Sequence, residues 1–351
     1  MKVLIVKLSS LGDIVHTLPL INEIQRYFPH AQVDWLVGKK GYEFLTLIPN
    51  INNIYLANYK NILQLQKQKY DFVIDVQGLL KSAILSKVVC GNKVIGFKNT
   101  REFAHIFYDI KVNAGNLFKT SSHIIDLNLK LLAPLINNKQ SNSSNNNKIN
   151  FSIPRLKDTD NKQLFKEINL RKNQVKTKPL VAIFPTTTWK SKLWPIKYWF
   201  EVISDISRSY DLYICASTQD KDYLTPLTEQ LSLNNINYTD LTGETSVKDL
   251  FFLIQNSDLV IGMDSAGIHI ASATNNDFGY PDVIGLYGPT SPHRSGPYNL
   301  LANCLYLSNL ECIACRKKQC PLGHHNCMND IVPNDVSKLV NQRLTRGVLN
   351  S

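Results

Sequence analysis

The chain has 351 residues, 44% of them hydrophobic, and a formal net charge of +11. It is long enough for two domains, and it has no apolar run of about 18 residues that would indicate a transmembrane helix. The charge favours a nucleic acid, an anionic membrane surface or a phosphorylated substrate as partner, although the lack of long Lys/Arg blocks argues against a nucleic-acid tail.

Short apolar runs and amphipathic stretches alternate through the first half. The apolar run at the N-terminus is too short for a signal peptide, so it predicts a first strand and a cytoplasmic protein. Pro19 should kink the first helix or delay its start, and Pro134 should end or kink the last one. The polar tract 137–148 cannot bury enough apolar surface to order itself, so we expect a flexible surface loop. The expected strands are 2–7, 32–37, 53–56, 72–76, 93–97 and 150–153, and the expected helices are 14–28, 61–69 and 123–133.

The second half shows the same alternation, which implies a parallel sheet with helices on both faces. We expect a first domain, 1–165, and a second domain, 166–351, because the stretch between the two halves is charged and polar. Pro195 suits the first turn of a helix. The expected strands are 180–184, 212–216, a short one near 238, 259–263 and 283–287, and the expected helices are 196–207, one from about 220, 247–255 and one from 267.

The stretch 259–273 says most about function. Its apolar strand ends at Asp264 and Ser265, two good helix-capping residues, and the Ser265 hydroxyl can accept from a backbone N–H of the next turn. A strand that runs into a capped helix directs N–H groups and a positive dipole end to the crevice above the sheet, which favours a phosphate. Gly267 follows at the start of the helix, and His269 can reach the same crevice. An ordinary helix cap with a core histidine explains the same residues about equally well.

The loop after the first strand carries Ser10, Gly12, Asp13 and, one turn later, His16. Gly12 lets the backbone approach a ligand closely. The loop lacks the GxGxxG pattern, so a dinucleotide-binding oxidoreductase is not supported. Asp13 is either a helix cap or a carboxylate at the mouth of the crevice, where a general base belongs.

Two further strand ends in the second half carry hydroxyls or a cation. Thr187, Thr188 and Lys192 follow the first strand of this half and offer groups that bind phosphate. The turn Gly288-Pro289-Thr290-Ser291 follows another strand and adds more hydroxyls. Such a cluster of strand ends is what a nucleotide crevice in an open α/β sheet requires.

Five of the seven cysteines fall in the tail 304–327. Four of them have ligand spacing for a structural zinc, with two histidines nearby. The alternative is a loop of reduced surface thiols packed by its own side chains, and disulfides are disfavoured in a cytoplasmic chain. A zinc-dependent nucleic-acid binder would need a basic helix after the loop, and none follows. The four candidate ligands are Cys312, Cys315, Cys320 and Cys327.

Four stretches occur in a fixed order along the chain: Lys7-Leu-Ser-Ser-Leu-Gly-Asp-Ile-Val-His-Thr-Leu-Pro19, Asp75 to Ala83, Thr187-Thr188 with Lys192 to Pro195, and Asp264 to His269 followed by Tyr287 to Thr290. In this order they resemble the bacterial ADP-heptose:lipopolysaccharide heptosyltransferases, glycosyltransferase family 9, and most of all the type I members. Each motif is modest alone, but the ordered set is specific, and the resemblance runs from residue 1 to about 300.

The resemblance implies an α/β fold of the GT-B type, in which two Rossmann-like, doubly wound domains face a central cleft. The first domain would bind the acceptor and the second the ADP-sugar. The implied reaction moves L-glycero-D-manno-heptose from ADP-heptose to Kdo2-lipid A, in lipopolysaccharide inner-core synthesis, with inversion and no required metal. The implied partners are ADP-heptose, Kdo2-lipid A and the anionic cytoplasmic face of the inner membrane, where the enzyme would be peripheral, and no nucleic acid.

Residue roles follow from matching positions. Asp13 matches the catalytic base of the family, and the acceptor candidates are Ser10, Gly12, His16, Lys81 and Arg101. The donor candidates are Thr187, Thr188, Lys192, Asp264, Ser265, Ala266, Gly267 and His269. Ala266 stands where the family usually has glycine, and either Asp220 or Asp222 replaces a glutamate used toward the nucleotide. The alternatives are a related heptosyltransferase of type II or III with another acceptor, and a nucleotide-binding α/β protein that is not a transferase.

Overall fold

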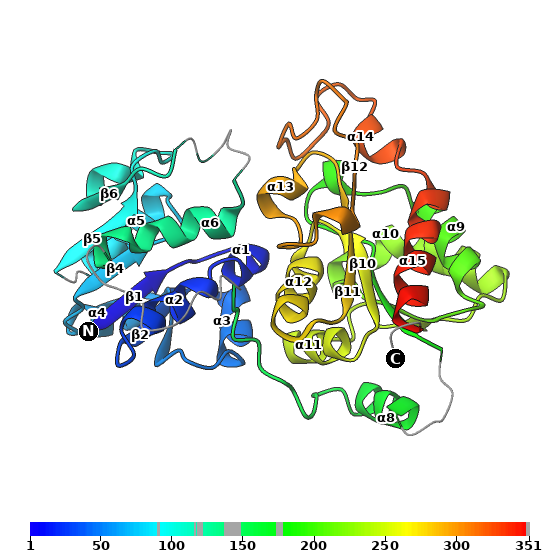
Figure 1. Cartoon of the computed structure of the whole chain (residues 1–351), viewed down its shortest axis with the longest axis horizontal. Helices are drawn as coiled ribbons and strands as arrows, with labels where there is room; N and C mark the ends of the chain where they lie inside the picture. The colour runs from blue at the N-terminus through cyan, green and yellow to red at the C-terminus, as the bar shows by residue number, and fades with distance from the viewer. Residues whose placement is uncertain (90–91, 116, 118–121, 137–148, 173–177, 349–351) are drawn as a thin grey trace. The chain divides into compact units, whose positions relative to one another are not determined.

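The computed structural model describes residues 1–89, 92–115, 117, 122–136, 149–172 and 178–348. The polar tract 137–148, expected as a surface loop, therefore lies outside the described residues. The chain divides into two compact units, Met1–Pro154 and Arg155–Ser351 (Figure 1). Across the described ranges, no helix has both the length and the apolar character needed to cross a membrane.

The division between the units falls earlier than the expected boundary at 165/166. The segment that leads into helix α8 (Lys162–Lys172) already packs on the second unit. The Phe165 ring lies 5.8 Å from the Phe252 ring, and Asn161 N donates to Asp249 Oδ1 at 2.8 Å. These contacts assign the segment to the second unit, because they bury it against residues far along the chain.

The first unit is built on a parallel six-stranded sheet with the order β3-β2-β1-β4-β5-β6. The chain reverses its direction of winding between β1 and β4, so the loops after these strands diverge at a switch point. Val3, Leu4, Ile5 and Val6 of β1 are fully buried, as a central strand covered on both faces requires. The strands are β1 (Lys2–Val6), β2 (Gln32–Val37), β3 (Asn53–Leu56), β4 (Phe72–Asp75), β5 (Lys93–Phe97) and β6 (Ile110–Val112).

Pro19 delays the start of a helix, as expected, whereas Pro134 acts differently from expectation. The expected helix 14–28 is two helices, because Pro19 begins the second and cannot continue the hydrogen-bond ladder of the first. Pro134 does not end its helix; it is the second residue of α7, where a helix needs no N–H donor. The helices are α1 (Leu11–Val15), α2 (Pro19–Tyr27), α3 (Lys39–Thr46), α4 (Tyr59–Gln66), α5 (Leu80–Val88), α6 (Ile124–Leu129) and α7 (Ala133–Ile136), with 3-10 turns η1 (Ala104–Phe107) and η2 (Lys130–Leu132).

The strand expected at 150–153 is wrong. Ser152 has a left-handed backbone with φ 54°, which interrupts an extended run. Phe151 and Ile153 are buried, which explains the apolar pattern. The segment is attached by side chains instead of strand pairing, since Ser152 Oγ donates to Asn22 Oδ1 at 2.6 Å.

The second unit repeats this plan, with a parallel sheet of the order β12-β11-β10-β7-β8-β9. Its switch point lies between β7 and β10, and α12 follows β10 directly. The strands are β7 (Leu180–Phe184), β8 (Asp211–Ile214), β9 (Thr239–Asp240), β10 (Leu259–Met263), β11 (Asp282–Tyr287) and β12 (Cys304–Tyr306). The remaining helices are α9 (Ile196–Ile206), α10 (Lys221–Leu233), α11 (Val247–Gln255), α12 (Ala266–Phe278), α13 (Pro292–Ser295), α14 (Asn326–Asn329) and α15 (Pro333–Val348), with η3 (Lys190–Lys192), η4 (Thr218–Asp220) and η5 (Leu301–Asn303).

Candidate active site

Asp264 is the centre of a polar cluster at the switch point of the second sheet. It follows the last residue of β10, beside the loop that follows β7. Lys192 Nζ lies 2.7 Å from Asp264 Oδ2, and Thr290 Oγ1 donates to the same oxygen at 2.6 Å. His269 Nε2 lies 3.0 Å from the other carboxylate oxygen, and Thr187 Oγ1 donates to the backbone oxygen at 3.1 Å. The loops after β7 and β11 and the first turn of α12 thus meet at one carboxylate.

The Asp264 carboxylate is ionised although it is only 5% exposed. Burial alone would raise its pKa, but the charge of Lys192 and then the contact with His269 outweigh burial and hold the pKa of Asp264 well below its usual range. Lys192 is thereby fixed at the start of α12, and its ammonium also lies 4.7 Å from the centre of the Trp189 ring. A buried ion pair often adds little to the net stability of a fold, so stability alone does not explain this one. Side chains with strongly shifted pKa values cluster at functional sites, and we therefore take Asp264 as the centre of a candidate site.

Helix α12 presents its amino end beside this cluster, as expected. Ser265 occupies the N-cap position with an extended backbone, but its hydroxyl makes no capping hydrogen bond, so that detail of the prediction is wrong. Because Ser265 does not cap them, the first N–H groups of α12, from Ala266 onward, and the positive end of the helix dipole favour an anion.

Gly267 serves the packing of α12. A Cβ at this position would lie 2.8 Å from the ring of Phe184, the last residue of β7. The glycine therefore lets the helix approach the neighbouring strand, and that contact explains it without a ligand.

The two acidic candidates after β8 differ in their surroundings. Asp220 Oδ2 accepts from Thr186 Oγ1 at 3.0 Å and from Ser217 Oγ at 2.6 Å, so it lies beside the loop after β7. Asp222 is exposed in the first turn of α10. Thr188, in the same loop as Thr186, is exposed. The structure thus brings Asp220, and not Asp222, to the segment that carries Lys192.

Asp13 lies in α1, directly after the loop that follows β1 in the first unit. Its Oδ2 accepts from Ser10 N at 3.0 Å and from Ser10 Oγ at 2.9 Å, which closes the first turn of the helix. Gly12 is buried beside it, whereas Asp13 is half-buried. The carboxylate therefore caps its own helix and also remains within reach of solvent, so the structure is compatible with both roles that the sequence left open.

Of the other acceptor candidates, two are exposed and lie on segments that are joined to each other, and one is buried. Lys81 is exposed in the first turn of α5, and Arg101 is exposed just before η1. Leu80 N donates to Glu102 Oε2 at 3.1 Å, which joins these two segments. His16 is the buried candidate, because it is 5% exposed and packs edge-on against the ring of a second buried histidine at 5.6 Å.

The loop after β4 supports the loop after β1. Gln77 Oε1 accepts from Leu8 N at 3.1 Å and from Ser9 N at 3.2 Å. Asp75, the buried last residue of β4, accepts from Tyr108 Oη at 2.7 Å, and burial raises the pKa of this carboxyl. These bonds fix the backbone on which Asp13 and Lys81 are placed.

The four predicted zinc ligands lie in residues 312–327, which we call the cysteine loop. Burial opposes ionisation of Cys320, but the backbone N–H groups of residues 322–325 outweigh it and lower the pKa of its thiol. Burial and then the neighbouring cysteines raise the pKa of Cys327 to about 11. Among the residues that the structure describes, no three His, Cys, Asp or Glu side chains form a group that could hold a metal ion. We therefore assign no metal to the loop; zinc stays a prediction that the metal content of the purified protein would test.

Thr290 belongs to the cluster although the sequence analysis did not place it among the donor candidates. The turn 288–291 was notable for its hydroxyls, but their target was not apparent. The sheet order supplies it, because β11 pairs with β10 and brings Thr290 to the Asp264 carboxylate.

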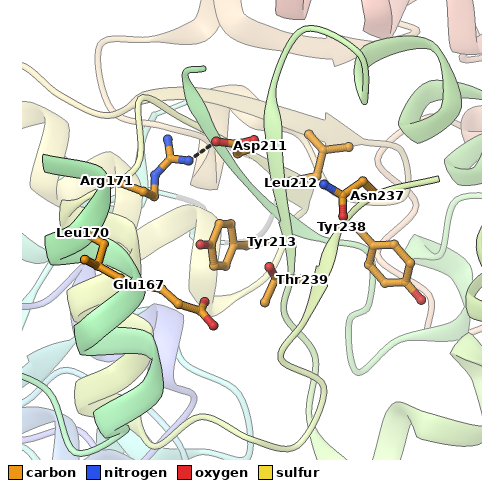
Figure 2. Close-up of a pocket in the computed structure, with 9 residues that line it drawn as sticks. All are labelled: Glu167, Leu170, Arg171, Asp211, Leu212, Tyr213, Asn237, Tyr238 and Thr239. Atoms are coloured by element: carbon orange, nitrogen blue, oxygen red, sulfur yellow. Dashed lines mark hydrogen bonds and ion pairs between the residues drawn. The ribbon is translucent and has the colours of Figure 1, made fainter. Parts of the chain in front are cut away.

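A separate cavity of about 290 Å³ lies at the β8–β9 edge of the second sheet, between these strands and α8 (Figure 2). Arg171 points to Asp211 and forms an ion pair with it, while Tyr213 lies between α8 and the strands. Asp211 begins β8, whereas the Asp264 cluster follows the carboxyl ends of the strands. The cavity is therefore distinct from the cluster, and we assign it no role in the site.

Two parallel sheets of identical strand order, each with its own switch point, define an α/β protein of the GT-B fold, which solved heptosyltransferase structures share. Residues 59–326 match the model of glycosyltransferase family 9 (heptosyltransferase), and the chain belongs to this family. The fold class and the family expected from the sequence are thus confirmed.

Relatives that are named heptosyltransferase 1 and relatives that are named heptosyltransferase 2 both resemble the chain. The lipopolysaccharide core heptosyltransferase OpsX of Haemophilus influenzae is 29% identical over 85% of this chain and 82% of its own length. Lipooligosaccharide heptosyltransferase 2 of Campylobacter jejuni is 25% identical over 96% of both chains. Among solved structures, E. coli heptosyltransferase WaaC with ADP has a TM-score of 0.71 and 20% identity, covering 98% of this chain and 100% of its own. E. coli ADP-heptose lps heptosyltransferase II has a TM-score of 0.73 and 19% identity, covering 99% of both.

Proposed function

We propose that the chain transfers L-glycero-D-manno-heptose from ADP-heptose to Kdo2-lipid A in the synthesis of the lipopolysaccharide inner core. Family membership supports heptosyl transfer, and the relatives above are named for this reaction on lipopolysaccharide or lipooligosaccharide. The observation that carries the donor half is the buried Lys192–Asp264 pair at the amino end of α12.

The second unit would bind the donor. Negative charge grows on the diphosphate as ADP leaves, and the Lys192 ammonium and the N–H groups of α12 are placed to stabilise it. Thr188 can add a hydroxyl donor, and Asp220, beside the loop after β7, is placed to accept from a ribose hydroxyl. Because these groups meet the developing charge, we propose that the transfer requires no metal.

The first unit would bind the acceptor and supply the base. An acceptor hydroxyl attacks the anomeric carbon on the face opposite ADP, the new C–O bond forms, and the bond to the diphosphate oxygen breaks. Asp13 takes the hydroxyl proton, and the single displacement from the opposite face inverts the anomeric centre. Lys81 and Arg101 offer cations to the carboxylates and phosphates of Kdo2-lipid A.

The full chain is expected to convert ADP-heptose and Kdo2-lipid A to ADP and heptosylated lipid in equal amounts, in the presence of EDTA. Mass spectrometry of the lipid and chromatography of the nucleotide would measure this. The matched comparison is Kdo2-lipid A that already carries one heptose. Product only from this second acceptor would contradict the assignment to Kdo2-lipid A and favour the type II alternative, and product from neither would contradict both.

An exposed apolar patch on the first unit supports the lipid side of the proposal. Leu80, Ile84 and Val88 are exposed and four residues apart, so they form one stripe along α5. Phe103 and Ile106, at the adjoining turn η1, are 72% and 65% exposed. We call these five side chains the α5 patch. Several exposed apolar side chains gathered on neighbouring elements indicate an interaction surface.

Cations border the α5 patch. Lys81 lies on α5 between two members of the stripe, and Arg101 lies two residues before Phe103. Apolar side chains enter the headgroup region of a bilayer, and each nearby Lys or Arg adds roughly 1 kcal/mol on an anionic leaflet. We therefore propose that the α5 patch docks the first unit on the anionic cytoplasmic face of the inner membrane.

Phe103→Ser with Ile106→Ser is expected to lower binding to phosphatidylglycerol-containing vesicles at least about tenfold, because each buried side chain of this size contributes roughly 1.5 to 3 kcal/mol. Sedimentation with vesicles would measure it. Leu233→Ser is the control, since Leu233 is more exposed than either residue but lies on α10 of the second unit. An equal loss in both variants, or none in the first, would contradict the docking role.

A further inference from the structure

Ser191, which immediately precedes Lys192, bonds to the cysteine loop through all three of its polar groups. Its N–H donates to Lys318 O at 3.2 Å, and its hydroxyl donates to Lys317 O at 2.6 Å. Its carbonyl oxygen lies 2.5 Å from His325 Nε2. A carbonyl only accepts, so this contact requires the ring proton on Nε2. Ser191 is 3% exposed, so water does not compete strongly for these bonds.

The cysteine loop also bonds to the turn after β11. Ala314 N donates to Gly288 O at 3.3 Å, and Arg316 N donates to Pro289 O at 2.8 Å. The turn after β11 packs closely on the end of the cysteine loop and the residue after it. A Cβ at Gly288 would lie 3.0 Å from the sulfur of Cys327 and 2.4 Å from the sulfur of Met328. The loop therefore holds two segments that are far apart in the sequence.

Each of these two segments delivers a side chain to the Asp264 carboxylate. Lys192 follows Ser191, and Thr290 follows Pro289, and the two side chains contact the same oxygen at 2.7 Å and 2.6 Å. A shift of either backbone segment would move the ammonium or the hydroxyl away from the amino end of α12. The loop bonds to the segments that carry these two side chains, so its contribution is to place them.

We propose that the cysteine loop is a positioning element of the donor site and that His325 is its main positioning residue. His325 is the loop side chain that bonds to Ser191, and its left-handed backbone, φ 56°, is one that a non-glycine residue rarely adopts. The inference rests on the proposed ADP-heptose donor and adds to it a group that acts on donor affinity without touching the donor.

His325→Ala is expected to raise the KM for ADP-heptose and the Kd for ADP about tenfold, with kcat within about twofold of wild type, because one partly buried hydrogen bond is lost and Lys192 is displaced. His325→Gln keeps an N–H donor and is expected to recover most of the affinity. Gln319→Ala is the matched control, since this side chain is exposed on the same loop. Calorimetry with ADP and steady-state kinetics on the full chain would measure these effects.

The outcomes separate this inference from the proposed function. A wild-type chain that does not bind ADP contradicts the proposed function, and the inference falls with it. A wild-type chain that binds ADP, with His325→Ala binding equally well, overturns the inference alone. Equal losses in the Ala and Gln variants also overturn it, because they indicate general disturbance. If His325→Ala does not fold, Ser191→Ala, which deletes one of the three bonds, should raise the Kd about threefold, and an unchanged Kd overturns the inference.

Discussion

Asp13→Asn is expected to lower kcat about 100- to 10,000-fold, while the Kd for ADP stays within about twofold of wild type. The amide has nearly the shape of the carboxylate, and its oxygen can still accept from Ser10, but it cannot take a proton from an acceptor hydroxyl. Kinetics with ADP-heptose and Kdo2-lipid A, together with calorimetry on ADP, would measure the two quantities.

Ser10→Ala separates the capping role of Asp13 from catalysis. It removes the hydroxyl that bonds to Asp13 Oδ2 but keeps the carboxylate, so it should cost about 1 kcal/mol of stability and change kcat little. A large fall in kcat in Ser10→Ala would mean that the loss of activity in Asp13→Asn comes from altered helix geometry and not from lost proton transfer. Asp13 is not the base if Asp13→Asn retains more than about a tenth of the wild-type kcat.

Lys192→Ala is expected to raise the KM for ADP-heptose about 10- to 100-fold, with a smaller effect on kcat, because a charge-assisted hydrogen bond to the diphosphate is lost. The same change leaves the buried Asp264 carboxylate without its nearest cation, which should lower the free energy of unfolding by about 3 to 5 kcal/mol. Kinetics and denaturant unfolding would measure the two effects separately.

Lys192→Met combined with Asp264→Asn is the control for Lys192→Ala. It removes both charges, so most of the stability should return while the KM stays high. Recovery of donor affinity along with stability would show that Lys192 acts through folding. An unchanged KM in Lys192→Ala would count against its role at the diphosphate.

The stability effect of Lys192→Ala should depend on pH in a defined direction. Since folding lowers the pKa of Asp264, its ionised form favours the folded state. That contribution is complete above the unfolded pKa, about 3.9, and is lost as the pH falls through the lower folded value. The difference in stability between wild type and Lys192→Ala should therefore be largest near neutral pH and become smaller in acid.

The central strands could be predicted to within one residue, and the two central strands of the second sheet exactly. Of the edge strands, β3 could be predicted exactly, whereas β6 and β12 could not. The range of β10, like that of β7, agrees with expectation, because a strand buried on both faces is an unbroken apolar run between turn residues. In contrast, β6 and β12 are three-residue edge strands with partly exposed side chains, and their sequences carry no such run. The sequence indicated that helices are interrupted near Pro19 and Pro134. It did not indicate that Pro134 lies in the first turn of a new helix instead of ending one.

The types of the site residues could be predicted, but their partners could not. Asp264 and Lys192 stand at strand ends in a pattern that indicates a phosphate site, whereas their mutual ion pair follows from the sheet order. The choice of Asp220 over Asp222 depends on which side chain reaches the loop after β7. The contact of His325 with Ser191 joins residues 134 positions apart, and no local pattern could have indicated it.

The pairing of Lys192 with Asp264 has a consequence for selectivity among anions. A lone ammonium at a helix amino end would attract inorganic phosphate and other small metabolites that are abundant in a cell. Here a resident counter-ion already satisfies the ammonium, so an incoming molecule must offer more than one negative group, and contacts beyond them, to compete. We therefore expect the site to discriminate by multivalency before any sugar or base is recognised.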